Sequence, residues 1–179
     1  SMRAGPELVR AWEEIEAVSI AAIEGYCIGG ACALALTCDF RILGADGWMR
    51  LPEVPLGMNM PWRTLPRLTG LVGASRAKQM TIFGEKIDAE TSLSWGLVDE
   101  IVASGSALQE SLKWAGKISG LPPLPVRMTK EAINATANAL NQLSAYMDRD
   151  QYLLTSTSED LKEGIAAFRE RRSPKFSGN

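Results

Sequence analysis

The stretch VSIAAIEGYCIGGACALALTCDFRIL, residues 18–43, carries the pattern that decides the fold. Its first part, Val18 to Tyr26, is uncharged up to Glu24 and partly β-branched, which predicts one buried strand. Residues 30–37 are apolar on every side, so a helix there has to be enclosed by other elements. Residues 38–44 alternate enough for a second strand. The stretch therefore predicts a strand, a buried helix and a second strand in succession.

Hydrophobic periodicity and helix stop signals extend this pattern along the chain. Short strands are expected at residues 48–51 and 97–102. Helices are expected over residues 6–17, 61–69, 75–83, 88–96, 106–119 and 158–172. A further long helix is expected to start in the proline group at residues 121–126 and to run to about residue 146. Because the sheet-forming segments come first, we predict an α/β core at residues 2–120 followed by a helical region at residues 121–179.

The composition excludes several classes of function. None of the 179 residues is histidine, which excludes Ser-His-Asp triads, Cys-His dyads and histidine-containing zinc sites. The formal net charge is -2, whereas a nucleic-acid-binding surface usually needs a basic excess. Catalysis would rely on carboxylates, lysines, hydroxyls, thiols or backbone N–H groups, and we expect no metal or redox cofactor.

The three cysteines, Cys27, Cys32 and Cys38, lie in apolar surroundings without a CxxC pair. Buried thiols in a reducing compartment explain them better than a metal site or a disulfide framework does. No apolar run is long enough for a membrane helix, and the N-terminus lacks the pattern of a signal peptide. The sequence therefore favours a cytoplasmic protein with no membrane partner.

Two consecutive glycines, Gly29 and Gly30, stand where the predicted strand gives way to the buried helix. The first N–H groups of a helix have no partner within it and carry the positive end of its dipole. Because glycine lets a ligand approach the backbone closely, the Gly30 N–H is a candidate donor to an oxyanion. The alternative is that both glycines serve only the close packing of strand against helix.

The segment LPEVPLG, residues 51–57, places Glu53 between two prolines in an otherwise uncharged turn. Apolar surroundings disfavour an ionised carboxylate, which raises its pKa and suits it to proton transfer near neutral pH. The alternative is an ordinary carboxylate of a surface loop. The order and spacing of the glycine pair and Glu53 favour the catalytic interpretation.

Together these segments resemble the enoyl-CoA hydratase/isomerase, or crotonase, superfamily. The resemblance continues through LPRLTGLVGASRAKQMTIFGEKIDAETSLSWGLVDEIV, residues 65–102, and into MTKEAIN and EGIAAFRERRSPKF near the end. It implies an α/β fold of the ClpP/crotonase type, a spiral of ββα turns followed by helices at a trimer interface. It also implies an acyl-CoA thioester as substrate, polarised in an oxyanion hole, with coenzyme A as part of that substrate.

The resemblance assigns half of the oxyanion hole to Gly30 and acid/base catalysis to Glu53. Family hydratases use a second glutamate three residues after this glycine, where the present chain has Ala33. Isomerisation of a double bond needs only one base, so Ala33 favours isomerase-like chemistry, while the family resemblance by itself favours hydration. Thioester hydrolysis and decarboxylation are alternatives within the superfamily.

A second departure follows Gly57, where many family hydratases have a glycine-rich segment and this chain has MNMPW, residues 58–62. Met58 and Trp62 are candidates to line the acyl pocket, and core packing is expected for at least one of the bulky residues here. Asn59 and Arg63 are candidates to orient an acyl group or water.

Near the C-terminus, the resemblance places Phe168 and Arg171 where family members contact coenzyme A bound to a neighbouring subunit, and a solvated basic helix end is the alternative. Complete members also carry spiral turns before the region matched here, which supply the second oxyanion N–H. The chain is thus expected to be an N-terminally truncated member. Uncovered apolar surface predicts a homo-oligomer, a trimer or dimer of trimers by resemblance. A truncated subunit without turnover is the alternative to an enzyme.

Overall fold

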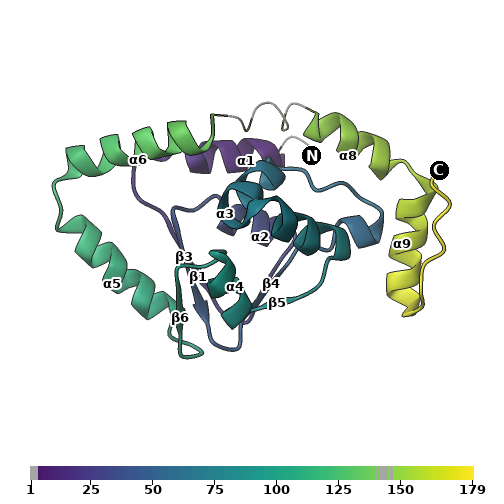
Figure 1. The fold of residues 1–179 in the computed structure, drawn as a ribbon, viewed down its shortest axis with the longest axis horizontal. Coiled ribbons are helices and arrows are strands. Elements are labelled where there is room, and N and C mark those ends of the chain that lie inside the picture. Colours follow the sequence, from purple (N-terminus) through teal and green to yellow (C-terminus); the bar gives the residue numbers. More distant parts are fainter. Residues whose placement is uncertain (1–3, 140, 142–144, 146) are drawn as a thin grey trace.

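The computed structural model describes residues 4–139, 141, 145 and 147–179, and two small sheets lie at its centre with helices around them (Figure 1). The strands are β1 (Ile20–Ile23), β2 (Tyr26–Ile28), β3 (Phe40–Gly44), β4 (Trp48–Arg50), β5 (Ile87–Asp88) and β6 (Glu100–Val102). The first helices are α1 (Ala4–Glu13), α2 (Gly30–Ala35), the 3-10 turn η1 (Val54–Leu56), α3 (Thr64–Lys78) and the π-helical turn η2 (Gln79–Phe83). They are followed by α4 (Ala89–Trp95), α5 (Ala107–Ser119), α6 (Pro123–Ala137), α8 (Asp148–Ser156) and α9 (Glu159–Glu170).

Consecutive strands alternate between the two sheets, which gives the core the form of a spiral. β1, β3 and β6 pair in parallel in one sheet, while β2 and β4 pair in parallel in the other and β4 pairs antiparallel with β5. One turn consists of β1, β2 and α2, and the next consists of β3, β4 and α3. The structure thereby confirms the α/β class and the ββα spiral. The predicted division at residue 120 falls between α5 and α6, and the independence of the two parts as domains stays a prediction.

Gly25 interrupts the strand that the sequence predicts as continuous over residues 18–26. Its φ of 67° lies in the left-handed region, so the chain leaves the sheet of β1 there and enters the other sheet as β2. A Cβ added at Gly25 would meet nothing within 4 Å, so the backbone conformation alone requires glycine. The prediction of one strand was wrong because an apolar run does not indicate which of two sheets receives each half.

The helices predicted at residues 61–69 and 75–83 are also different in the structure. α3 begins at Thr64 and passes through Gly70, so a stop at Gly70 is wrong. At Gly73, φ 79° and ψ 162° are not helical, so a break between two helical segments lies there as predicted, and η2 continues the second segment to Phe83. Gly70 weakens the first segment without ending it, because the burial of Leu68 and Val72 in the core holds the segment together.

Three further boundaries correct the sequence analysis. α1 ends at Glu13 instead of residue 17, and the half-exposed Ile15 beyond it has little core to cover. α6 ends at Ala137, and of its predicted extension residues 140, 142–144 and 146 lie outside the described residues. α8 and the short β5 were not predicted at all. The predicted helices at α4, α5 and α9 and the strands at β3, β4 and β6 are confirmed within a few residues.

The core lies between the sheets and the inner faces of α2, α3 and α4. Its completely enclosed side chains include Leu43, Met49, Leu68, Met80 and Leu97. The three cysteines are free and buried, as predicted. Within the described ranges, no helix combines the length and the apolarity needed to cross a membrane, and no group of three or more acidic or cysteine side chains is placed to hold a metal ion.

Replacing Gly25 by alanine should lower the free energy of unfolding by about 1–2 kcal/mol, because a Cβ disfavours the left-handed backbone even where it has open space. Gly116→Ala is the matched control, since Gly116 also has open space but lies inside α5, where alanine should stabilise by about 1 kcal/mol. Urea unfolding of both variants measures the difference. Equal effects of the two substitutions would contradict the argument.

Candidate active site

Gly29 joins the end of β2 to the start of α2, and it is hydrogen-bonded to the end of β4. Its N–H donates to the carbonyl oxygen of Arg50 over 3.0 Å, and its own carbonyl oxygen accepts the N–H of Ala33 over 2.9 Å. The backbone at Gly29 has φ 57° and ψ −123°, a conformation that L residues with a Cβ rarely adopt. The turn leaves Gly30 as the first residue of α2, where its N–H has no acceptor within the helix.

Glu53 reaches this turn from the segment that follows β4. Its carbonyl oxygen accepts the N–H groups of Leu56 (3.1 Å) and Met58 (2.9 Å), which fixes the backbone of η1 under the side chain. A Cβ added at Gly29 would lie 2.8 Å from Oε1 of Glu53. The carboxylate therefore occupies the space that the missing side chain of Gly29 leaves open.

Burial is the main influence on the charge of Glu53. The residue is half-buried, and its Oε2 is enclosed without a hydrogen-bond partner among the described residues. Burial raises the pKa of this carboxyl above its usual value, while its hydrogen bond with the backbone and the positive charge of Arg50 lower it by less. The structure thus agrees with the sequence analysis on the apolar surroundings of Glu53.

Position 33 contributes a methyl group instead of a carboxylate. Ala33 is 1% exposed and packs in the core, where its carbonyl oxygen accepts the hydroxyl of Thr37. Next to it, the hydrogen bond with Cys27 and complete burial raise the pKa of the Cys32 thiol, so Cys32 stays neutral. Of the described charged groups, only Arg50 has a charge that lowers the pKa of Glu53.

The indole of Trp62 stands over Gly30. A Cβ added at Gly30 would lie 2.8 Å from Cη2 of Trp62, and one added at Gly5 of α1 would overlap the other side of the same ring. Trp62 is only partly buried and packs against the core cluster. Of the predicted pocket residues, Trp62 therefore lies next to Gly30, and the backbone of Met58 is bound to that of Glu53.

The rest of the segment has other partners than the sequence analysis expected. Met60 is 2% exposed and belongs to the core, which confirms core packing for one of the bulky residues. The amide of Asn59 donates to Gln151 over 2.8 Å, and the backbone N–H of Asn59 donates to the hydroxyl of Thr155 over 3.1 Å. Asn59 is thus bound to α8, and the orientation of an acyl group or water by Asn59 stays a prediction.

Arg63 is also tied to α8, through its backbone. The Arg63 N–H donates to Oδ2 of Asp148 over 2.8 Å, and Asp148 is only 7% exposed. Burial raises the pKa of Asp148, while the hydrogen bond from Arg63 and the charges of Arg63 and Arg67 oppose this rise. Asp148 was not singled out from the sequence because its partner, the backbone N–H of Arg63, is 85 residues away. Arg67 was not singled out because it binds backbone carbonyl oxygens and the distant side chain of Glu13.

Phe168 and Arg171 lie at the end of α9, which packs on η1 through Gly164 and Leu56. Phe168 is 71% exposed, and Arg171 ends the helix in the left-handed conformation. The structure describes no contact between this pair and Glu53 or the glycine turn. A role toward coenzyme A on a neighbouring subunit therefore stays a prediction.

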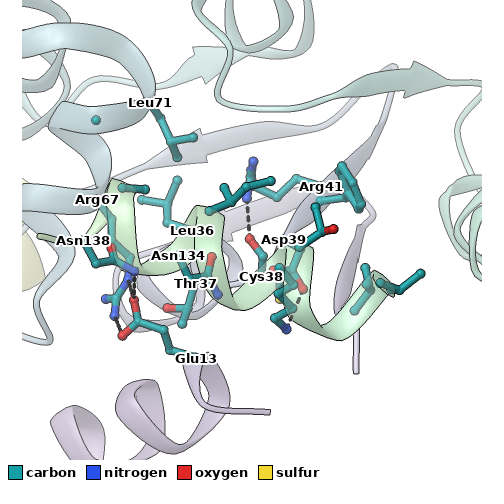
Figure 2. A pocket seen from close by; sticks show the side chains of 18 of the residues that line it. Glu13, Leu36, Thr37, Cys38, Asp39, Arg41, Arg67, Leu71, Asn134 and Asn138 are labelled. Atoms are coloured by element: carbon teal, nitrogen blue, oxygen red, sulfur yellow. Dashed lines mark hydrogen bonds and ion pairs between the residues drawn. The ribbon is translucent and has the colours of Figure 1, made fainter. Parts of the chain in front are cut away.

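A separate cavity of about 780 Å³ lies between α6 and the spiral core, and it does not include the glycine turn or Glu53 (Figure 2). Its wall is largely apolar, and its charged groups are paired: Arg67 with Glu13, Lys130 with Asp39, and Arg41 with Asp99 outside the wall. Figure 2 shows Glu13, Arg67 and Asn138 pointing toward one another at one end of this cavity. The cavity lacks an unpaired carboxylate of the kind that Glu53 offers.

The raised pKa of Glu53 predicts a definite pH dependence of stability. Between the pKa in the unfolded chain and the higher pKa in the folded one, the folded state binds more protons, so this group makes stability fall as pH rises. Relative to the unchanged protein, Glu53→Gln should therefore gain stability from pH 4 toward pH 8. Urea unfolding across this range measures it.

Glu131→Gln serves as a control for that prediction, because Glu131 is exposed on α6. Its stability relative to the unchanged protein should vary less with pH than that of Glu53→Gln. A gain that is flat with pH, or that decreases, would show that burial does not raise the pKa of Glu53.

Comparison with known proteins supplies the family. A model of the enoyl-CoA hydratase/isomerase family matches residues 3–179. The mevalonyl-coenzyme A hydratase of Beauveria bassiana is 36% identical over 158 residues, covering 87% of this chain and 56% of that protein. The 2,3-dehydroadipyl-CoA hydratase of Escherichia coli is 34% identical over 170 residues, covering 93% of this chain and 67% of that protein.

The fold agrees with these matches. The crystal structure of an enoyl-CoA hydratase from Mycobacterium avium subsp. paratuberculosis superimposes with a TM-score of 0.93 at 26% identity, covering 98% of this chain and 72% of that one. The chain spans little more than half the length of the Beauveria relative. From the family match, the sequence identity and the spiral fold together, this chain belongs to the enoyl-CoA hydratase/isomerase family.

Proposed function

We propose that this chain carries the proton-transfer part of an acyl-CoA active site, with Glu53 as its acid/base and the Gly30 N–H as one donor to the thioester oxygen. The observation that carries the proposal is the position of the Glu53 carboxyl. It lies against Gly29 at the start of α2, half-buried, with Oε2 free of protein partners in the described residues. Such a group is able to exchange a proton with a bound substrate.

The reaction that fits one carboxylate is the migration of a double bond in an enoyl-CoA. Glu53 takes a proton from C2 of a 3-enoyl thioester, and the electron pair moves into the carbonyl to give an enolate. The Gly30 N–H stabilises the negative oxygen. Glu53 then returns the proton to C4 as the enolate collapses, which leaves a 2-enoyl thioester and restores the carboxylate.

Hydration of a 2-enoyl-CoA is the second candidate, and the names of the relatives favour it. Several are hydratases, including a crotonyl-CoA hydratase of Syntrophomonas wolfei at 35% identity. Against hydration stands Ala33, since Glu53 alone would have to handle both the attacking water and the proton added to carbon. Thioester hydrolysis and decarboxylation would use the same oxyanion donor and are separated by their products.

The remaining features of the proposal concern binding. Met58 and Trp62 form the wall for the acyl group, and Phe168 and Arg171 meet the coenzyme A of a neighbouring subunit. Coenzyme A is part of the substrate, and proton transfer needs no metal or redox cofactor. The free buried cysteines suit a reducing compartment such as the cytoplasm.

Self-association into trimers is part of the same proposal. α6 has no buried residue and exposes Leu124, Met128 and Ile133, each at least 60% accessible. Such an apolar helix face is typical of a surface that another subunit covers. A single monomeric species in analytical ultracentrifugation would contradict the proposed trimer. It would leave the proposed acid/base role of Glu53 unchanged.

Proton NMR in deuterated water tests the chemistry, with a 2-enoyl-CoA and a 3-enoyl-CoA each incubated with the protein and with Glu53→Gln. We expect double-bond migration with deuterium uptake by the unchanged protein. Loss of the proton carrier should lower the rate by about 10²-fold or more, because general acid/base catalysis contributes that much. Glu90→Gln, at an exposed position of α4 away from the proposed assembly face, should keep the original rate.

Each other result has a definite meaning. A 3-hydroxyacyl product would show hydration despite Ala33. Undiminished turnover by Glu53→Gln would remove Glu53 from the mechanism. Absence of any conversion by the unchanged protein would favour a subunit without turnover.

A further inference from the structure

The left-handed conformation is adopted by two adjacent residues that are not glycine: Trp62, with φ 70°, and Arg63, with φ 55°. Each costs conformational free energy, since a Cβ disfavours this region and bulky side chains do so most. Such a pair persists only where surrounding contacts hold it. The contacts that hold it therefore also decide where the Trp62 indole lies.

Polar side chains from two helices, α8 and α3, bind the backbone of this pair. Asp148 of α8 accepts the N–H of Arg63 over 2.8 Å. From the other side, Nη1 of Arg67 in α3 donates to the carbonyl oxygens of Trp62 (3.4 Å) and Arg63 (3.1 Å). Arg67 is itself buried and paired with Glu13 of α1, as Figure 2 shows. The pair is thus held at both its donor and its acceptor groups.

Asp148, which accepts the Arg63 N–H, comes from the C-terminal region and is 85 residues away in the chain. On the same face of α8, one and two turns further on, Gln151 and Thr155 bind Asn59. Of these three residues of α8, Asp148 is the buried one, and it binds Arg63, the residue next to Trp62. An unpaired Arg63 N–H inside the protein would be costly, so the loss of this acceptor should let the turn relax.

Relaxation of the turn at residues 62 and 63 would change the position of the Trp62 ring in the candidate active site. The Trp62 ring fits between Gly5 and Gly30, so close that a Cβ on either glycine would collide with it. A small rotation of the left-handed turn would withdraw the ring from Gly30 and enlarge the space next to the proposed oxyanion donor. The position of the Trp62 ring beside the proposed oxyanion donor therefore depends on the backbone conformation of residues 62 and 63.

We propose that Asp148 is a positioning residue: by accepting the Arg63 N–H it holds the Trp62 indole over Gly30 and so limits the size of the acyl group that binds there. The limit on acyl size rests on the proposed function. The placement of the indole does not, and it is measured without substrate.

The decisive variant is Asp148→Ala, which removes the acceptor. Asp148→Asn is the conservative variant, because its side-chain oxygen is still able to accept the Arg63 N–H. Asp150→Ala is the matched control, since Asp150 is an exposed acid on the same helix with no described contact to the turn. Circular dichroism establishes that each variant is folded.

The first readout is the emission of Trp62 and its quenching by acrylamide in the absence of substrate. It is isolated by subtracting, in each background, the spectrum of the same protein with Trp62→Phe. We expect Asp148→Ala to shift this emission to the red and to increase quenching. Asp148→Asn and Asp150→Ala should leave both close to the original values.

The second readout is the ratio of kcat/KM for an octenoyl-CoA to that for a butenoyl-CoA. Asp148→Ala should raise the ratio by about tenfold or more, because even one methylene in an apolar pocket changes discrimination by about 10- to 200-fold. Asp148→Asn should return the ratio toward the original value, which a general loss of stability would not do.

The proposal is overturned if folded Asp148→Ala keeps the original Trp62 emission, if Asp150→Ala changes it as much, or if Asp148→Asn behaves like the alanine variant. If Asp148→Ala alone does not fold, Arg63→Gly is compared with Arg63→Gly plus Asp148→Ala, since glycine relieves the backbone cost at position 63. The same shift is expected there. Failure of the unchanged protein to convert any enoyl-CoA would instead overturn the proposed function, and the emission would still decide the placement of Trp62.

Discussion

The left-handed turn at Gly29 is the constraint on which the site depends. Its N–H is bound to the carbonyl oxygen of Arg50, so the start of α2 in one spiral turn is fixed against the end of β4 in the next. The missing Cβ leaves room for the Glu53 carboxyl, and the missing Cβ of Gly30 leaves room for the Trp62 ring. A carboxyl group, a helix N–H without an acceptor in its helix, and an apolar wall are thereby brought together around two residues without side chains.

Burial then gives this arrangement its chemistry. Glu53 has lost part of its solvent without gaining a partner for Oε2, and burial raises its pKa more than Arg50 lowers it. The position at which a family hydratase would hold a second carboxylate is a methyl group in the core. A single carboxyl with a raised pKa suits the transfer of one proton between two carbons better than the addition of water.

The C-terminal helices act on the site from a distance in the chain. α8 holds residues 59–63 by three hydrogen bonds from one face, and Arg67 of α3 completes the grip through the two carbonyl oxygens of the turn. A helix outside the spiral thus determines the backbone that carries Trp62. The role proposed for Asp148 would make acyl selectivity depend on this packing of the C-terminal region.

The sequence by itself determined the α/β class, most helices and the buried cysteines, because burial patterns and glycine turns are local signals. Before the structure, only the family resemblance placed Glu53 and the glycine pair in one site, and the structure brings them together. Only the tertiary structure decided the break at Gly25, the existence of α8, the core position of Met60, and the binding of Asn59 and Arg63 to that helix. These depend on which sheet accepts a strand and on contacts between side chains and backbone groups about ninety residues apart, for which periodicity carries no information. Bulky residues at two left-handed positions are the clearest case, since local preference opposes that conformation and distant hydrogen bonds impose it.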